Sequence, residues 1–103
     1  MNEFCSCERL THIKVEADFY TDPLWCSICG YNLDMDEFPL RELIKEKLML
    51  WVEKYEDVLE ENSHQSSFEY ELNKQEYNQV GLELTEEIKK DIGHQYNISF
   101  SYV

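Results

Sequence analysis

Four cysteines lie in the first third of the chain, in two closely spaced pairs. The first pair is Cys5 and Cys7, and the second is Cys26 and Cys29, followed by Gly30. Zinc in structural sites takes four thiolate or imidazole ligands in a tetrahedron, and two short loops with two thiolates each supply such a set. The glycine favours the tight turn that would hold two sulfurs on one ion. The spacing therefore predicts a structural Zn²⁺ site with the ligands Cys5, Cys7, Cys26 and Cys29.

Other chemistries of these cysteines have requirements that the sequence meets less well. Disulfides are rare in reducing compartments, where cysteine pairs more often bind metals. A redox pair of Cys26 and Cys29 needs a helix N-terminus to lower the thiol pKa, whereas the sequence predicts a hairpin here. A catalytic zinc needs an open coordination position, which four cysteines do not leave. Iron is the alternative metal, because the Cys5-x-Cys7 spacing departs from the commoner double Cys-x-x-Cys ribbon.

Three stretches of the chain carry a resemblance to known proteins. Residues 26–34 (CSICGYNLD) resemble the metal-binding turns of zinc-ribbon and rubredoxin-like modules. Together with residues 46–55 (EKLMLWVEKY) and 73–85, they make the layout similar to small uncharacterised zinc-ribbon-like proteins of Bacillus-type bacteria and their phages. The resemblance covers most of the chain and implies metal binding in a bacterial or phage setting. It carries no activity that could be transferred.

The chain is strongly acidic, with 22 Asp and Glu against 9 Lys and Arg and a formal net charge of −13 over 103 residues. Such a charge argues against direct binding of nucleic acid or of an anionic membrane surface. It fits either plain solubility or a basic protein partner, which would be attracted at long range. The N-terminus lacks a signal-peptide pattern, and no apolar stretch approaches the roughly 20 residues of a membrane span. We therefore expect a cytoplasmic location.

Hydrophobic periodicity predicts an α+β fold. Residues 11–20 and 96–102 alternate apolar and polar side chains as strands do, while residues 39–62 and 70–92 repeat apolar side chains at helical spacing. We expect an N-terminal zinc-ribbon hairpin, two main helices, and a C-terminal strand that pairs with the N-terminal strand in a small antiparallel sheet. Residues 1–38 would form the zinc-ribbon-like segment and residues 39–103 the helical segment with the C-terminal strand, packed together as one compact domain.

Some individual residues carry further expectations. Gly81, inside the second predicted helix, marks either a close helix crossing or a break before Thr85, and we favour the crossing. Trp51 lies at helical spacing and is expected in the core. A hypothesis from residue type alone assigns four tyrosines to an exposed sheet face that meets a partner: Tyr20, Tyr31, Tyr96 and Tyr102.

The motifs of common enzymes are missing from the sequence, which shows no Gly-x-Ser-x-Gly, phosphate loop or His-Glu-x-x-His. We therefore expect a noncatalytic, zinc-stabilised protein that binds and modulates a basic protein partner, such as an immunity protein, an inhibitor or an anti-defence protein. A homodimer is compatible with this function. One alternative is a zinc-ribbon accessory subunit of nucleic-acid machinery, although the chain lacks a basic face. Another is a thiol oxidoreductase that uses Cys26 and Cys29.

Overall fold

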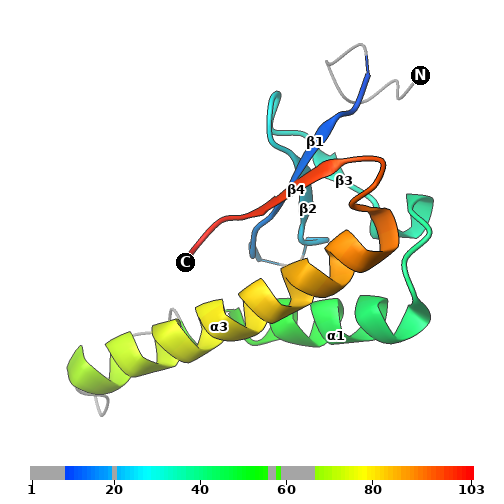
Figure 1. The fold of residues 1–103 in the computed structure, drawn as a ribbon. Helices are drawn as coiled ribbons and strands as arrows, with labels where there is room; N and C mark the ends of the chain where they lie inside the picture. The colour runs from blue at the N-terminus through cyan, green and yellow to red at the C-terminus, as the bar shows by residue number, and fades with distance from the viewer. Residues whose placement is uncertain (1–8, 20, 56–57, 59–66) are drawn as a thin grey trace.

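The computed structural model describes residues 9–19, 21–55, 58 and 67–103. Within them the chain forms a four-stranded sheet and two long helices, α1 and α3, which lie side by side below the sheet in Figure 1. The predicted α+β class is confirmed. Within the described ranges no helix combines the length and apolar character needed to cross a membrane.

The sheet contains β1 (His12–Val15), β2 (Leu24–Cys26), β3 (Asn32–Leu33) and β4 (Asn97–Phe100) in the order β3-β2-β1-β4. β1 and β2 form the predicted antiparallel hairpin, in which Ile13 lies opposite Cys26. β2 and β3 form a second antiparallel hairpin. The alternating apolar residues of β1, Ile13 and Val15, are completely buried and face the helices, as a half-buried strand requires.

The C-terminal strand β4 pairs with β1, as the sequence predicts, but the two strands are parallel. His12 lies opposite Asn97 and Val15 lies opposite Phe100. The expectation of an antiparallel sheet is therefore wrong for this pair, and the sheet is mixed. Alternation of side chains defines which face of a strand is buried but not the direction of its neighbour. The chain returns to β1 through both helices, and a parallel pair needs such a long crossover connection.

Helix α1 (Glu42–Glu53) is shorter than the predicted 39–62. Before α1, Met35–Glu37 form a separate 3₁₀ helix. Arg41 has an extended backbone, so α1 begins after it, at Glu42. The Arg41 backbone N–H donates to Asp91 Oδ2 at 3.1 Å, so a partner on α3 satisfies it at the start of α1. At the other end, Lys54 lies in a turn; residues 56–57 and 59–62 are outside the described ranges.

Helix α3 (Ser67–Ile92) is continuous through Gly81, so the predicted close crossing is confirmed and the predicted break is absent. A Cβ atom at Gly81 would lie 2.4 Å from the Phe100 ring and 2.7 Å from the Trp51 ring. Only a residue without a side chain lets the two rings approach α3 this closely. Gly81 thus joins α1, α3 and β4 at one point of the core, where Trp51 is buried as expected.

Candidate functional site

The second cysteine pair lies in the turn that joins β2 to β3. Cys26 ends β2 and is completely buried, whereas Cys29 is exposed in the turn. Gly30 has a φ of 82°, in the left-handed region that favours glycine, and its N–H donates to the Cys26 carbonyl at 2.8 Å. The tight turn predicted from the Cys-x-x-Cys-Gly spacing is therefore present, and it brings Cys26 and Cys29 into one short loop.

The first pair of predicted ligands, Cys5 and Cys7, lies outside the described residues. Over the part of the chain that is described, no group of three or more His, Cys, Asp or Glu side chains is placed to hold a metal ion. The structure therefore shows the turn that carries Cys26 and Cys29, while the four-ligand zinc site stays a prediction.

The position of this turn also bears on redox chemistry. A reactive dithiol usually has its nucleophilic cysteine at the N-terminus of a helix, where the helix dipole lowers the thiol pKa. Cys26 and Cys29 instead lie between two strands of a hairpin. The arrangement favours a structural role for the pair over a catalytic one.

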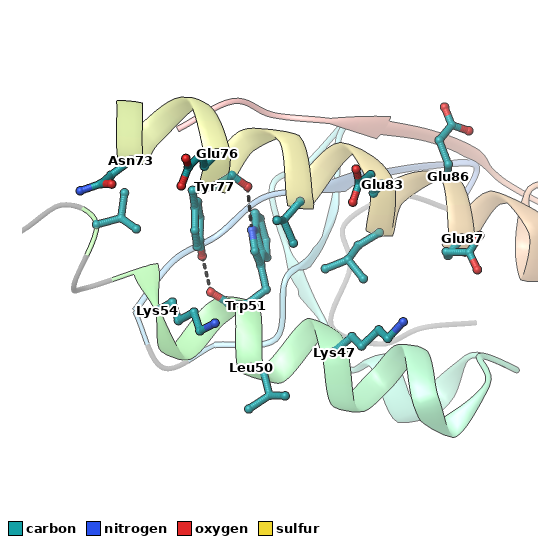
Figure 2. A pocket seen from close by; sticks show the side chains of 13 residues that line it. Lys47, Leu50, Trp51, Lys54, Asn73, Glu76, Tyr77, Glu83, Glu86 and Glu87 are labelled. Carbon is teal, nitrogen blue, oxygen red and sulfur yellow. Dashed lines mark hydrogen bonds between the residues drawn. The ribbon is translucent and has the colours of Figure 1, made fainter. Parts of the chain in front are cut away.

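A groove lies between α1 and α3 and has a volume of about 800 Å³. We call it the α1/α3 groove. Figure 2 shows Lys47 and Lys54 on its α1 side and Glu76 and Glu83 on its α3 side. Its thirteen lining residues are Lys47, Leu50, Trp51, Lys54, Val58, Asn73, Glu76, Tyr77, Val80, Glu83, Leu84, Glu86 and Glu87.

The floor of the groove is held by two buried aromatic residues, Trp51 and Tyr77. The Trp51 indole N–H donates to the Tyr77 carbonyl at 3.0 Å, and the Tyr77 hydroxyl donates to the Trp51 carbonyl (Figure 2). Their rings are stacked with centroids 4.7 Å apart and an interplanar angle of 11°. Two hydrogen bonds and a stacked pair fix the distance between α1 and α3, so the groove is preformed.

The two glutamates at the far end of the groove already have basic partners. Glu87 pairs with Lys90 at 2.6 Å and with Arg41 at 3.2 Å, and Glu86 pairs with Lys89 at 3.4 Å. The hydrogen bond from Lys90, followed by the contacts with Arg41, lowers the pKa of Glu87 below its ordinary value. These carboxylates are engaged within the chain and are less available to a ligand.

The other charged lining residues are engaged less. For Lys47, Lys54, Glu76 and Glu83 the structure shows no ion pair with another described residue. Glu83 accepts only a 3.4 Å hydrogen bond from Gln79. The groove thus has a basic wall and an acidic wall whose charged side chains are exposed and able to meet a partner.

The structure describes three of the four tyrosines that the sequence assigns to an exposed sheet face, and they differ in exposure. Tyr31 and Tyr102 are exposed, but Tyr96 is half-buried and packs edge-on against Phe38 with ring centroids 5.5 Å apart. Tyr20 is outside the described residues. The sequence interpretation instead missed the groove, although its residues carry a signal: Lys47 and Lys54, and likewise Glu76 and Glu83, are seven positions apart.

Comparison with known proteins identifies a family. The model of the Serratia CdiI immunity protein-like family matches residues 11–102. The match includes Cys26 and Cys29 but begins after Cys5 and Cys7. No curated protein matches the chain. Neither comparison links it to zinc ribbons or to Bacillus-type bacteria and their phages. Because the match extends over nearly all of the sequence, the chain belongs to the Serratia CdiI immunity protein-like family.

Proposed function

We propose that this chain is an immunity protein that inactivates a toxin by binding to it. The observation that carries the proposal is the family match over residues 11–102. The action is noncatalytic: the protein covers a surface that the toxin needs, and affinity comes from shape and charge complementarity. The preformed groove between α1 and α3 supports such a role, because a rigid surface loses little conformational entropy on binding.

The proposed toxin is basic. A net charge of −13 on 103 residues attracts a basic partner over distances comparable with the Debye length, about 8 Å at physiological ionic strength. An inhibitor that must reach its toxin before the toxin reaches its target gains from fast association. Electrostatic steering raises association rates well above those of neutral pairs, which are about 10⁵–10⁶ M⁻¹s⁻¹.

A structural zinc ion is proposed to stabilise the N-terminal hairpin through Cys5, Cys7, Cys26 and Cys29. Two observations support this: the Cys-x-x-Cys-Gly turn between β2 and β3, and the positive φ of Gly30. Zinc would act on folding alone, since four thiolates close its coordination sphere.

The proposed function is tested with a toxin domain sought among the genes that neighbour the gene of this chain. The chain is co-expressed with that domain, and cell growth is measured together with the affinity of the purified pair. We expect growth to be rescued, a stable complex, and an association rate that falls as salt is raised from 50 to 500 mM. An unrelated protein of similar net charge is the control. Absence of binding, or equal rescue by the control, would overturn the proposal.

A further inference from the structure

We propose that the α1/α3 groove receives an amphipathic helix of the toxin, which presents basic side chains to α3 and acidic side chains to α1. The inference rests on the proposed function for the identity of the partner. It adds the surface that is used and the chemistry of the segment that occupies it.

The charged side chains on the two walls of the groove are spaced by two helical turns, which matches the repeat of a helical partner. Lys47 on α1 and Lys54, the residue that directly follows α1, are seven residues apart, and Glu76 and Glu83 are seven residues apart on α3. Seven residues make two helical turns, so each pair projects from one side of its helix with about 10.5 Å between its members. A helix laid between the walls repeats with the same period and can meet both members of each pair, as flanking charges do in coiled coils.

Apolar side chains continue along the same walls. Leu50 is 56% exposed on α1 and Val80 is 44% exposed on α3, and both line the groove. Leu43 is 57% exposed and lies seven residues before Leu50, hence on the same side of α1. Single exposed apolar side chains are common, but apolar residues at heptad spacing with charges between them are typical of a helix that packs against another helix.

The dimensions limit the size of the occupant. α1 has twelve residues and is the shorter wall, so the wall is about 18 Å long. A partner helix can therefore contact both walls over about three turns. Helices that bind in hydrophobic grooves use apolar anchors at this spacing, and the anchors here would meet Leu50, Val80 and the buried floor residue Leu84.

The opposite signs of the walls separate this inference from simple attraction of a basic protein. If net charge alone controlled binding, then Lys47→Glu/Lys54→Glu, which makes the chain more acidic, would strengthen binding. If a helix lies in the groove with its acidic side against these lysines, the same change must weaken binding. The charge-reversed α3 wall, Glu76→Lys/Glu83→Lys, weakens binding in both cases, so the lysine pair is the decisive variant.

The experiment measures association and dissociation rates between these variants and the toxin domain that serves to test the proposed function. The matched control is Glu46→Lys/Glu53→Lys, two exposed glutamates on α1 that are also seven residues apart but do not line the groove. It changes the net charge as much as Glu76→Lys/Glu83→Lys does. We expect each groove pair to weaken binding on the order of tenfold or more through faster dissociation, whereas the control mainly slows association.

A third variant, Leu50→Ser/Val80→Ser, tests the apolar contacts, and we expect it also to speed dissociation. All substituted side chains are exposed, and thermal unfolding of each variant shows whether folding is preserved.

The binding measurements distinguish a failure of the proposed function from a failure of the groove inference. If the wild-type chain does not bind the toxin, the proposed function itself fails. If it binds, but Lys47→Glu/Lys54→Glu leaves the affinity unchanged or raises it, the groove inference is wrong while the proposed function stands. If the groove variants instead change the molecular mass of the chain alone in sedimentation, the occupant is a second copy, and the inference is likewise overturned.

Discussion

Trp51 and Tyr77 exchange hydrogen bonds across the contact between α1 and α3, each side chain donating to the backbone carbonyl of the other residue. Helices usually pack through side chains alone, and bonds from side chains to the partner's backbone fix their relative position more closely. Burial, with a smaller contribution from nearby Tyr55, raises the pKa of the Tyr77 hydroxyl. The hydroxyl therefore remains a donor at physiological pH, and the floor of the α1/α3 groove stays intact.

Replacing the Tyr77 hydroxyl tests this relationship. Tyr77→Phe keeps the stacked ring and removes one donor, while the Trp51 carbonyl retains the Lys54 N–H at 3.2 Å. We expect the free energy of unfolding, measured by urea denaturation, to fall by about 1 kcal/mol, the usual net contribution of one hydrogen bond. Tyr102→Phe is the matched control, because Tyr102 is 65% exposed and should tolerate the change. Equal stability of the two variants would contradict the prediction.

Gly81 provides a test of the close crossing. Alanine favours a helix over glycine by about 1 kcal/mol, so Gly81→Ala would stabilise α3 if the space around it were open. The new Cβ would instead meet the rings of Phe100 and Trp51. We expect a net loss of about 1–3 kcal/mol, as for other overpacked cores. Gln75→Ala, on an exposed part of α3, serves as the control in the same denaturation series. A stabilised Gly81→Ala variant would show that the rings separate easily.

The lowered pKa of Glu87 predicts how the free energy of unfolding depends on pH. Its pKa in the folded chain is below the ordinary 4.5, chiefly because of the hydrogen bond from Lys90. A carboxyl group of lowered pKa contributes stability above its unfolded pKa, and this contribution is lost as the pH falls through the folded pKa. The difference in unfolding free energy between the wild type and Glu87→Gln should therefore be largest at neutral pH and vanish in acid.

Salt provides the control for this pH dependence. The Glu87 side chain is at the surface, so its interaction with Lys90 is screened at 1 M salt, where the Debye length is about 3 Å. The difference between the wild type and Glu87→Gln at pH 7 should then shrink. If the difference in unfolding free energy between the wild type and Glu87→Gln persists at high salt, or grows as the pH falls, the ion pair with Lys90 is not its cause.

The zinc proposal predicts one metal ion per chain. Elemental analysis of the purified protein should find zinc, and a chelator should lower the melting temperature, since metal binding is coupled to folding. Cys29→Ser is the most informative variant because Cys29 is exposed, whereas Cys26 is completely buried and its replacement also disturbs the core. Ser27→Ala, in the same turn, is the control. A metal-free protein with an unchanged melting temperature would end the proposal, and iron in place of zinc would revise it.

Several elements follow from local sequence patterns. The alternation of Ile13 and Val15, the apolar repeats of the two helices and the Cys-x-x-Cys-Gly turn each depend on neighbours within a few positions. Gly81 was also interpretable, because glycine in a helix interior costs about 1 kcal/mol relative to alanine and so indicates a close approach or a break. The start of α1 was not, because the side chain that binds the Arg41 backbone belongs to Asp91, fifty positions away.

The sequence by itself determined the fold class, the acidic charge and the turn between β2 and β3, because side-chain period and turn chemistry act locally. Only the tertiary structure decided that β4 runs parallel to β1 and that α1 and α3 enclose a groove with walls of opposite charge. Strand direction depends on the path of the connection, and the groove depends on the Trp51–Tyr77 contact between residues 26 positions apart. Both are nonlocal packing outcomes, which no short window of sequence contains.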